Sequence, residues 1–178
     1  MTRLMKWLLL SVFMVVLLQC GYKPIMWRDI PYRTIYIQEI KTLPEYAKHI
    51  AVFQGALQDR CLSMSGLSLS KDRMQSDLVL ATDLQRVTET VIATDIDRRV
   101  RQVQFTLICS FKLATRQGKT LWELKNYRFS DQFEVSSARG EFRNDAAAAY
   151  DSAFQNVSEM AVTHFSIALH RLEAERDQ

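Results

Sequence analysis

The segment from Val100 to Ala114 alternates between apolar and polar side chains over most of its length. From Val103 to Leu113, one parity is entirely apolar and comprises six residues: Val103, Phe105, Leu107, Cys109, Phe111 and Leu113. The other parity is polar except for Ile108 and comprises Gln102, Gln104, Thr106, Ser110 and Lys112 besides it. A period of two over this length predicts a long β-strand with one buried face and one face turned mostly toward water. The rest of the chain must therefore supply elements that cover the apolar face.

Three further strands are predicted around this one. Thr34–Ile40 is rich in β-branched and aromatic residues, and Asp77–Ile92 contains apolar residues of shared parity. Arg116–Lys119 is typical of a hairpin turn and leads into a strand over Thr120–Phe129. Residues 130–143 lack a pattern, and we expect a loop there.

Two segments have the spacing of amphipathic helices. In Glu45–Met64, apolar residues recur at steps of three and four, and Gly66 follows as a C-cap. A longer helix is predicted from an N-cap at Asn144 or Asp145 to about Leu172, with an apolar stripe on one side.

The expected order is therefore strand, helix, strand, strand, strand, helix. Burial of both helical stripes against one apolar sheet face predicts an α+β fold, a two-layer sandwich of a four-stranded mixed sheet with two helices on one face. We expect a single domain over residues 34–172 and a charged tail over 173–178. With 48% hydrophobic and 24% charged residues, the composition excludes a disordered chain, and a net charge of +3 does not favour nucleic acid as a partner.

The first nineteen residues have the features of an export signal. Arg3 and Lys6 precede an apolar run from Trp7 to Leu18, which spans about 18 Å as a helix against a bilayer core of about 30 Å. A cleaved signal peptide over residues 1–19 is the preferred interpretation, and a short inserted helix or a buried core helix is the alternative.

Cys20 follows Leu17, Leu18 and Gln19, and this arrangement resembles a bacterial lipobox. The resemblance implies that Cys20 becomes the N-terminus and carries two or three acyl chains. That number of chains is enough to hold a protein stably on a membrane, whereas a single chain binds only marginally. Gln19 departs from the small residue that is usual before the cysteine, and an ordinary cysteine near a signal cleavage site is the alternative.

Residues 20–33 are predicted to form a lipidated tether without regular structure. Its aromatic residues, Tyr22, Trp27 and Tyr32, suit two arrangements. They can sit at a lipid interface or pack the tether onto the domain.

Two cysteines remain in the domain, Cys61 and Cys109. An exported protein meets an oxidising compartment, which permits a disulfide between them. Two buried thiols that act as small apolar residues are the preferred alternative.

No arrangement of residues indicates catalysis. The three histidines, His49, His164 and His170, lack metal-ligand spacing, and the glycines form no phosphate-binding loop. We therefore expect a protein without enzymatic activity, without a metal and without a cofactor other than the covalent lipid on Cys20.

One charged segment suggests an anion site. Arg98, Arg99 and Arg101 place three guanidinium groups at the turn between the second and third strands. The planar fork of arginine binds phosphate in bidentate fashion, so these residues are the candidate lipopolysaccharide or anion site. The alternative is a solvated turn in which Asp95 and Asp97 pair with the arginines locally.

The chain resembles the lipopolysaccharide-assembly lipoprotein family, LptE, over essentially its whole length. Cys20–Pro24 (CGYKP) is similar to the family's mature N-terminus, and the strand of residues 34–40, the helix containing residues 50–57, the strand at Asp77–Leu80 and the Gly118 hairpin follow in the family's order. The long third strand and the C-terminal helix complete the match.

The resemblance implies a non-enzymatic lipoprotein of the outer membrane, anchored at its periplasmic face. In the family, the protein plugs the lumen of the LptD β-barrel, binds lipopolysaccharide through basic residues and assists its assembly. The implied partners are thus an LptD-type barrel and lipopolysaccharide. A lipid-anchored periplasmic adaptor or scaffold of another envelope complex, and a lipid-binding module, are the alternatives.

Replacement of Cys20 by Ala tests the anchor. We expect the variant to fold but to leave the membrane fraction, because it has no acyl chains. Membrane flotation and thermal unfolding, compared with a Cys61→Ala variant, measure the two properties. A Cys20→Ala protein that still floats with outer membrane after a high-salt wash would contradict the lipid anchor.

Overall fold

The computed structural model describes residues 31–63, 67–97, 99–135 and 141–175 of this chain. The predicted signal peptide, Cys20, Gly66 and Arg98 lie outside these residues. In chain order the elements are β1 (Thr34–Ile37), β2 (Lys41–Thr42), η2 (Pro44–His49), α2 (Ile50–Ser63), β3 (Ser68–Leu69), η3 (Arg73–Gln75), β4 (Leu78–Thr94), β5 (Val100–Thr115), β6 (Thr120–Glu134) and α3 (Glu141–Ala174). Among the described residues, no helix is long and apolar enough to cross a membrane.

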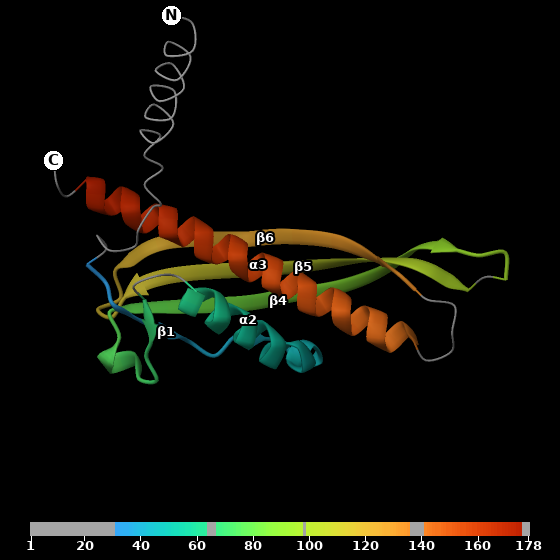
Figure 1. The fold of residues 1–178 in the computed structure, drawn as a ribbon, viewed down its shortest axis with the longest axis horizontal. Coiled ribbons are helices and arrows are strands. Elements are labelled where there is room, and N and C mark those ends of the chain that lie inside the picture. The colour runs from blue at the N-terminus through green and yellow to red at the C-terminus, as the bar shows by residue number, and fades with distance from the viewer. Residues whose placement is uncertain (1–30, 64–66, 98, 136–140, 176–178) are drawn as a thin grey trace, which may run out of the picture.

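The fold is the predicted α+β sandwich, with α2 and α3 together on one face of a mixed sheet (Figure 1). The strand order is β3-β1-β4-β5-β6, and β2 also pairs with β4. β1 is parallel to β3 and β4, while β4, β5 and β6 are antiparallel neighbours. The expected number of four strands is wrong, because the sheet has six. β2 and β3 have two residues each, too few to produce a periodic pattern in the sequence.

The boundaries of several elements also differ from the prediction, and β1 ends at Ile37 rather than at Ile40. The first helix begins as the 3-10 turn η2, and α3 begins at Glu141, before the predicted cap at Asn144 or Asp145, and ends at Ala174 inside the predicted tail. β6 continues to Glu134 through part of the predicted loop, because Glu134 still pairs with Gln102 of β5. Strand pairing thus overrides the absence of a local pattern.

The core lies between the helices and the apolar face of β5. All six apolar residues of that face are at most 2% exposed. Phe53 of α2 stacks on Phe154 of α3 at 4.8 Å between ring centroids, and it meets Phe111 of β5 edge-on at 6.3 Å. The two helices and the central strand therefore meet at one aromatic cluster.

A bulge in β4 changes which residues face the helices. The pairing with β5 shifts between Leu84 and Arg86, so that Leu84 pairs with Cys109 and Val87 pairs with Leu107. Both partners lie on the apolar face of β5, so the inward parity of β4 changes from even to odd. Glu89 consequently lies on the helix side, where its Oε1 accepts a hydrogen bond of 2.5 Å from the hydroxyl of Tyr150. Burial and this contact both raise the pKa of Tyr150 well above its usual range.

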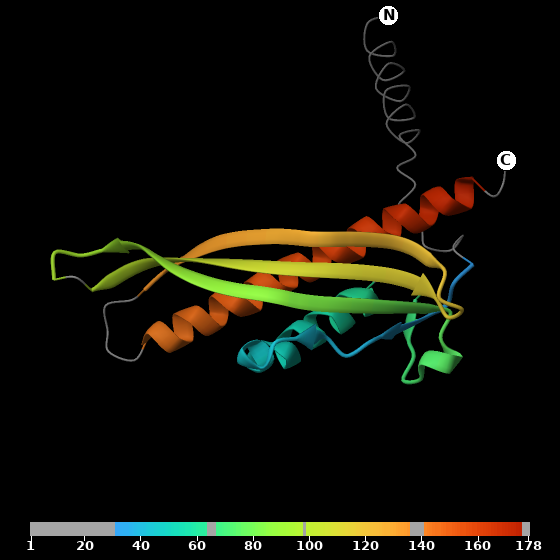
Figure 2. The same cartoon turned by 180° about the vertical axis from the view of Figure 1, so that it is seen from behind.

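The β4–β5 hairpin extends past the helical layer as an arm, and β6 accompanies it only as far as the pairing of Glu134 with Gln102 (Figure 2). Most of β4 from Arg86 onward is exposed. The arm is therefore the part of the described sheet that is least covered.

Cys61 and Cys109 are free thiols, and both are buried, with exposed fractions of 1% and 0%. Burial raises the pKa of each to about 12, with the charge of Asp83 adding to the effect at Cys109. The interpretation as buried apolar thiols is confirmed, and the disulfide is excluded in this structure.

Asp77 joins the start of β4 to the start of β1. Its Oδ2 accepts hydrogen bonds from the backbone N–H groups of Arg33 (2.8 Å) and Thr34 (3.0 Å) and from the Thr34 hydroxyl (3.0 Å). Partial burial raises the pKa of Asp77, but these bonds and the charge of Arg116 outweigh it and lower the pKa below its usual value. One carboxylate thus holds the end of β1 at which the chain enters the sheet.

Asp77→Ala is expected to lower the free energy of unfolding by about 1–2 kcal/mol at pH 7, a value reduced for the exposure of the site. Because the folded-state pKa is lowered, the contribution is complete above the unfolded-state pKa of about 4 and is lost as the pH falls through the folded-state value. Urea unfolding between pH 3 and pH 7 should therefore show the difference from wild type shrinking in acid. The exposed Asp59 of α2 supplies the control, with Asp59→Ala expected to change stability by less than about 0.5 kcal/mol. An Asp77→Ala effect that is independent of pH would contradict this role.

Candidate functional site at the tip of the hairpin

The turn between β4 and β5 is organised by one carboxylate. Asp95 Oδ1 accepts hydrogen bonds from the backbone N–H groups of Asp97 (3.0 Å) and Arg99 (2.8 Å). The backbone N–H of Asp95 in turn donates to the carbonyl oxygen of Arg99 at 2.9 Å. An aspartate that bonds the backbone two and four residues onward stabilises a tight turn, so the tip has a defined conformation.

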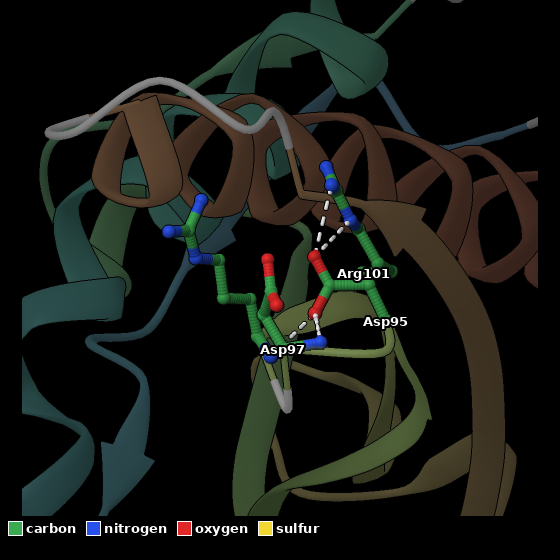
Figure 3. A network of polar contacts seen from close by, with 4 residues as sticks. Asp95, Asp97 and Arg101 are labelled. Carbon is green, nitrogen blue, oxygen red and sulfur yellow. Dashed lines mark hydrogen bonds and ion pairs between the residues drawn. The ribbon is translucent and has the colours of Figure 1, made fainter.

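The other oxygen of Asp95 binds Arg101 (Figure 3). Oδ2 lies 3.2 Å from Nε and 3.0 Å from Nη2 of that guanidinium group. The hydrogen bond from Arg99 is the main cause that lowers the pKa of Asp95, the charge of Arg101 acts in the same direction, and burial opposes them. Asp95 is therefore ionised at neutral pH and pairs with Arg101.

The three arginines of the predicted anion site have different positions. Arg101 pairs with Asp95, as the solvated-turn alternative expects for it, and its side chain remains 42% exposed. Arg99 is exposed, and Arg98 lies outside the described residues. The structure thus gives Arg101 a role in holding the turn and leaves the side chain of Arg99 accessible to solvent.

The same tip carries exposed apolar residues that were not predicted from the sequence. Ile96 is fully exposed, and Val91 and Ile92 are 50% and 45% exposed. An isoleucine between two aspartates in a turn was the signal in the sequence, because turn positions ordinarily carry small or polar residues. The tip therefore combines accessible cationic and apolar groups.

Two further basic residues, Arg116 and Lys119, lie in the turn between β5 and β6, at the other end of the sheet. The β5–β6 turn closes with a hydrogen bond from Thr115 N to Lys119 O at 2.8 Å, and Gly118 takes a φ of +92° that favours glycine. Arg116 Nη1 donates to the carbonyl oxygen of Met74 at 3.0 Å. Since β4, β5 and β6 are antiparallel neighbours, this turn and the hairpin tip lie at opposite ends of the sheet and are separate sites.

The face of the sheet away from the helices is polar. Thr106 of β5 and Ser130 of β6 share a hydrogen bond of 2.9 Å, and Ser110 accepts from Gln85 Nε2 and from the backbone N–H of Asn126, both at 3.0 Å. Gln104 and Lys112 are exposed on the same face. This face can form hydrogen bonds with water or with a polar wall over the length of β5.

Nothing in the described part of the chain groups three or more histidine, cysteine or acidic side chains as metal ligands. His49 is buried to 9% exposure and packs its ring 4.4 Å from that of Tyr150. Its position is that of a core aromatic residue rather than of a ligand.

The comparisons with known proteins concern the fold. No family model matches the chain, and no curated protein matches it. Uncharacterized lipoprotein B from Nitrosomonas europaea has a similar structure, with a TM-score of 0.52 and 13% identity over 80% of this chain and 90% of that one. A Xanthomonas campestris protein gives a TM-score of 0.55 and 12% identity over 79% and 87% of the two chains. A putative lipoprotein from Caulobacter crescentus gives 0.50 and 12% over 74% and 91%. At these identities the likeness establishes a shared fold.

Replacement of Asp95 separates its two contacts. Asp95→Ala should speed amide hydrogen exchange at Asp97 and Arg99, because both N–H groups lose their acceptor. Asp95→Asn should keep that protection, since a side-chain oxygen remains, but should weaken the contact with Arg101. Hydrogen exchange followed by NMR measures the first effect at the backbone N–H groups of Asp97 and Arg99 and the second at the side-chain Nε–H of Arg101. Asp97→Ala is the matched control. Equal protection in wild type and Asp95→Ala would show that the carboxylate does not hold the turn.

Proposed function

We propose that this chain is a non-enzymatic lipoprotein of the bacterial envelope, anchored through Cys20 at the periplasmic face of the outer membrane. We propose further that it acts as an LptE-like plug of an LptD-type β-barrel and assists lipopolysaccharide assembly. The apolar run followed by Cys20 supports the anchor. The shared fold of two proteins that are themselves called lipoproteins supports the class of protein.

The main support for the proposed role as a barrel plug is the polar face of the sheet. A plug must fill a barrel whose interior is polar and hydrated. The uncovered face of β4, β5 and β6 offers hydroxyl, amide and charged side chains to such a wall, while the helices keep the apolar face dry. A protein that bound a small apolar ligand between helices and sheet would need a cavity where Phe53, Phe111 and Phe154 pack together.

The hairpin tip supports the contact with lipopolysaccharide. Arg99 is accessible, and Arg98 precedes it in the sequence. Lipid A carries phosphate groups, for which the guanidinium fork is suited. Arg101 contributes indirectly in this proposal, because its pairing with Asp95 holds the turn.

Isolation of the tagged chain from its own envelope in mild detergent tests the proposal. We expect a stoichiometric large β-barrel among the retained proteins, identified by mass spectrometry. Periplasmic or inner-membrane proteins in place of a barrel would favour the adaptor and overturn the plug.

The lipid contact is tested by replacing Arg98 and Arg99 together with Asp. We expect lipopolysaccharide binding to weaken by about tenfold or more, as for loss of a charge-assisted contact, while thermal stability changes little. Lys119→Asp with Lys125→Asp is the control, because it makes the same change in charge at exposed positions of the β5–β6 hairpin. Equal loss in both double variants would indicate attraction by net charge alone, and unchanged binding in the first would remove the site.

A further inference from the structure

A groove of about 670 Å³ lies between the end of α2 and the C-terminal half of α3. Val162, Ile167 and Ala174 of α3 supply apolar lining, and Ile167 is 47% exposed. At its edge, Arg60 Nη2 and Glu159 Oε2 form an ion pair of 2.9 Å that joins the two helices. An apolar groove with a charged rim is the form of a binding surface for an extended segment.

The chain enters the domain near this groove. The backbone N–H of Ser68 donates to the carbonyl oxygen of Arg33 at 2.9 Å, and Thr34 pairs with Ser68. Ser63, which lines the groove, precedes Ser68 by five residues, so the two lie within about 17 Å of each other. Tyr32 already packs against the core. The first described residues are thus attached to the domain close to the groove.

The sequence before residue 31 has the composition of a segment that binds such a surface. Residues 20–30 read CGYKPIMWRDI, in which Trp27 is the largest apolar residue. Fully extended, the segment reaches about 37 Å, whereas the groove follows α3 from Glu159 to Ala174, about 22 Å of helix. With up to about 17 Å used to reach the groove, about 20 Å of extended chain remain, so the segment is long enough to occupy most of the groove.

We propose that residues 20–30 dock in the groove between α2 and α3, with Trp27 as the main apolar anchor beside Ile167. A buried tryptophan removes about 150–250 Å² from water, which suits the exposed apolar lining. The chain's own segment is favoured over a second copy, because covalent connection gives an effective concentration of the order of millimolar. In this arrangement the aromatic residues of the tether pack onto the domain and do not sit at a lipid interface. The docking does not depend on the proposed role in lipopolysaccharide assembly.

Tryptophan fluorescence of the full chain tests the docking. The sequence has three tryptophans, so Trp7→Phe with Trp122→Phe leaves Trp27 as the single reporter. We expect blue-shifted emission and protection from acrylamide quenching in detergent-purified protein. Ile167→Asp should reverse both, whereas Val52→Asp, at a 40% exposed position of α2, should not. Thermal unfolding of each variant verifies that the domain is folded.

Three results would overturn the proposal. The first is emission typical of a water-exposed tryptophan. The second is blue-shifted emission that Ile167→Asp does not change, which would place Trp27 in detergent or lipid. The third is a shift that appears only at high protein concentration, which would assign the groove to the tether of a second copy.

Disulfide trapping gives an independent measurement. In a Cys20→Ala background, which keeps both Trp27 and Ile167, Arg28→Cys combined with Thr163→Cys of the groove lining should oxidise rapidly to an intramolecular disulfide, since the native Cys61 and Cys109 are buried. Arg28→Cys combined with Val52→Cys is the matched pair and should oxidise at least about tenfold more slowly. Equal rates for the two pairs would mean that the segment samples the surface freely, and the proposal would fail.

Discussion

The apolar face of β5 is the constraint on which the rest of the domain depends. Burial of its five valine, leucine and phenylalanine side chains is worth about 1.5–3 kcal/mol each, and together they match the whole net stability of a typical domain. α2 and α3 are both needed on that face, and Phe53 and Phe154 bring them together over Phe111. Because both helices are used there, the opposite face remains open, and its polar side chains are a consequence of that arrangement.

The candidate site follows from a second local constraint, the carboxylate of Asp95. Three arginines close together in a sequence look equivalent, but the structure distinguishes Arg99 from Arg101 by what each contacts. Asp95 engages the guanidinium of Arg101 and the backbone of Arg99, so the side chain of Arg99 is left for another molecule. Charge counted along the sequence therefore overstates the charge that is available for binding.

The strongest periodicities of the sequence predicted the elements that carry the core. The alternation of β5 and the stripes of both helices were sufficient for the two-layer architecture, and the residues Arg116–Lys119 were sufficient for the turn between β5 and β6. β2 and β3 were not predictable, because strands of two residues exist only through their pairing with β4 and β1. The second half of β6 and the parity change after Leu84 likewise depend on register with β5. Of the site, the basic turn was predictable, whereas the pairing of Arg101 and the exposure of Ile96 required the three-dimensional structure.

The length of β4 gives the molecule a built-in spacer. Ile35, near the point where the chain enters, lies beside Leu78 at the start of β4, and the tip follows Thr94 at its end. At about 3.3 Å per residue, the two ends of this strand are about 50 Å apart. Whatever holds the N-terminus, the arm reaches a distance that is determined by the number of residues in β4 and β5. Removing two paired residues from each strand would shorten that reach by about 7 Å and leave every side chain on its original face, because two residues complete one period of the strand.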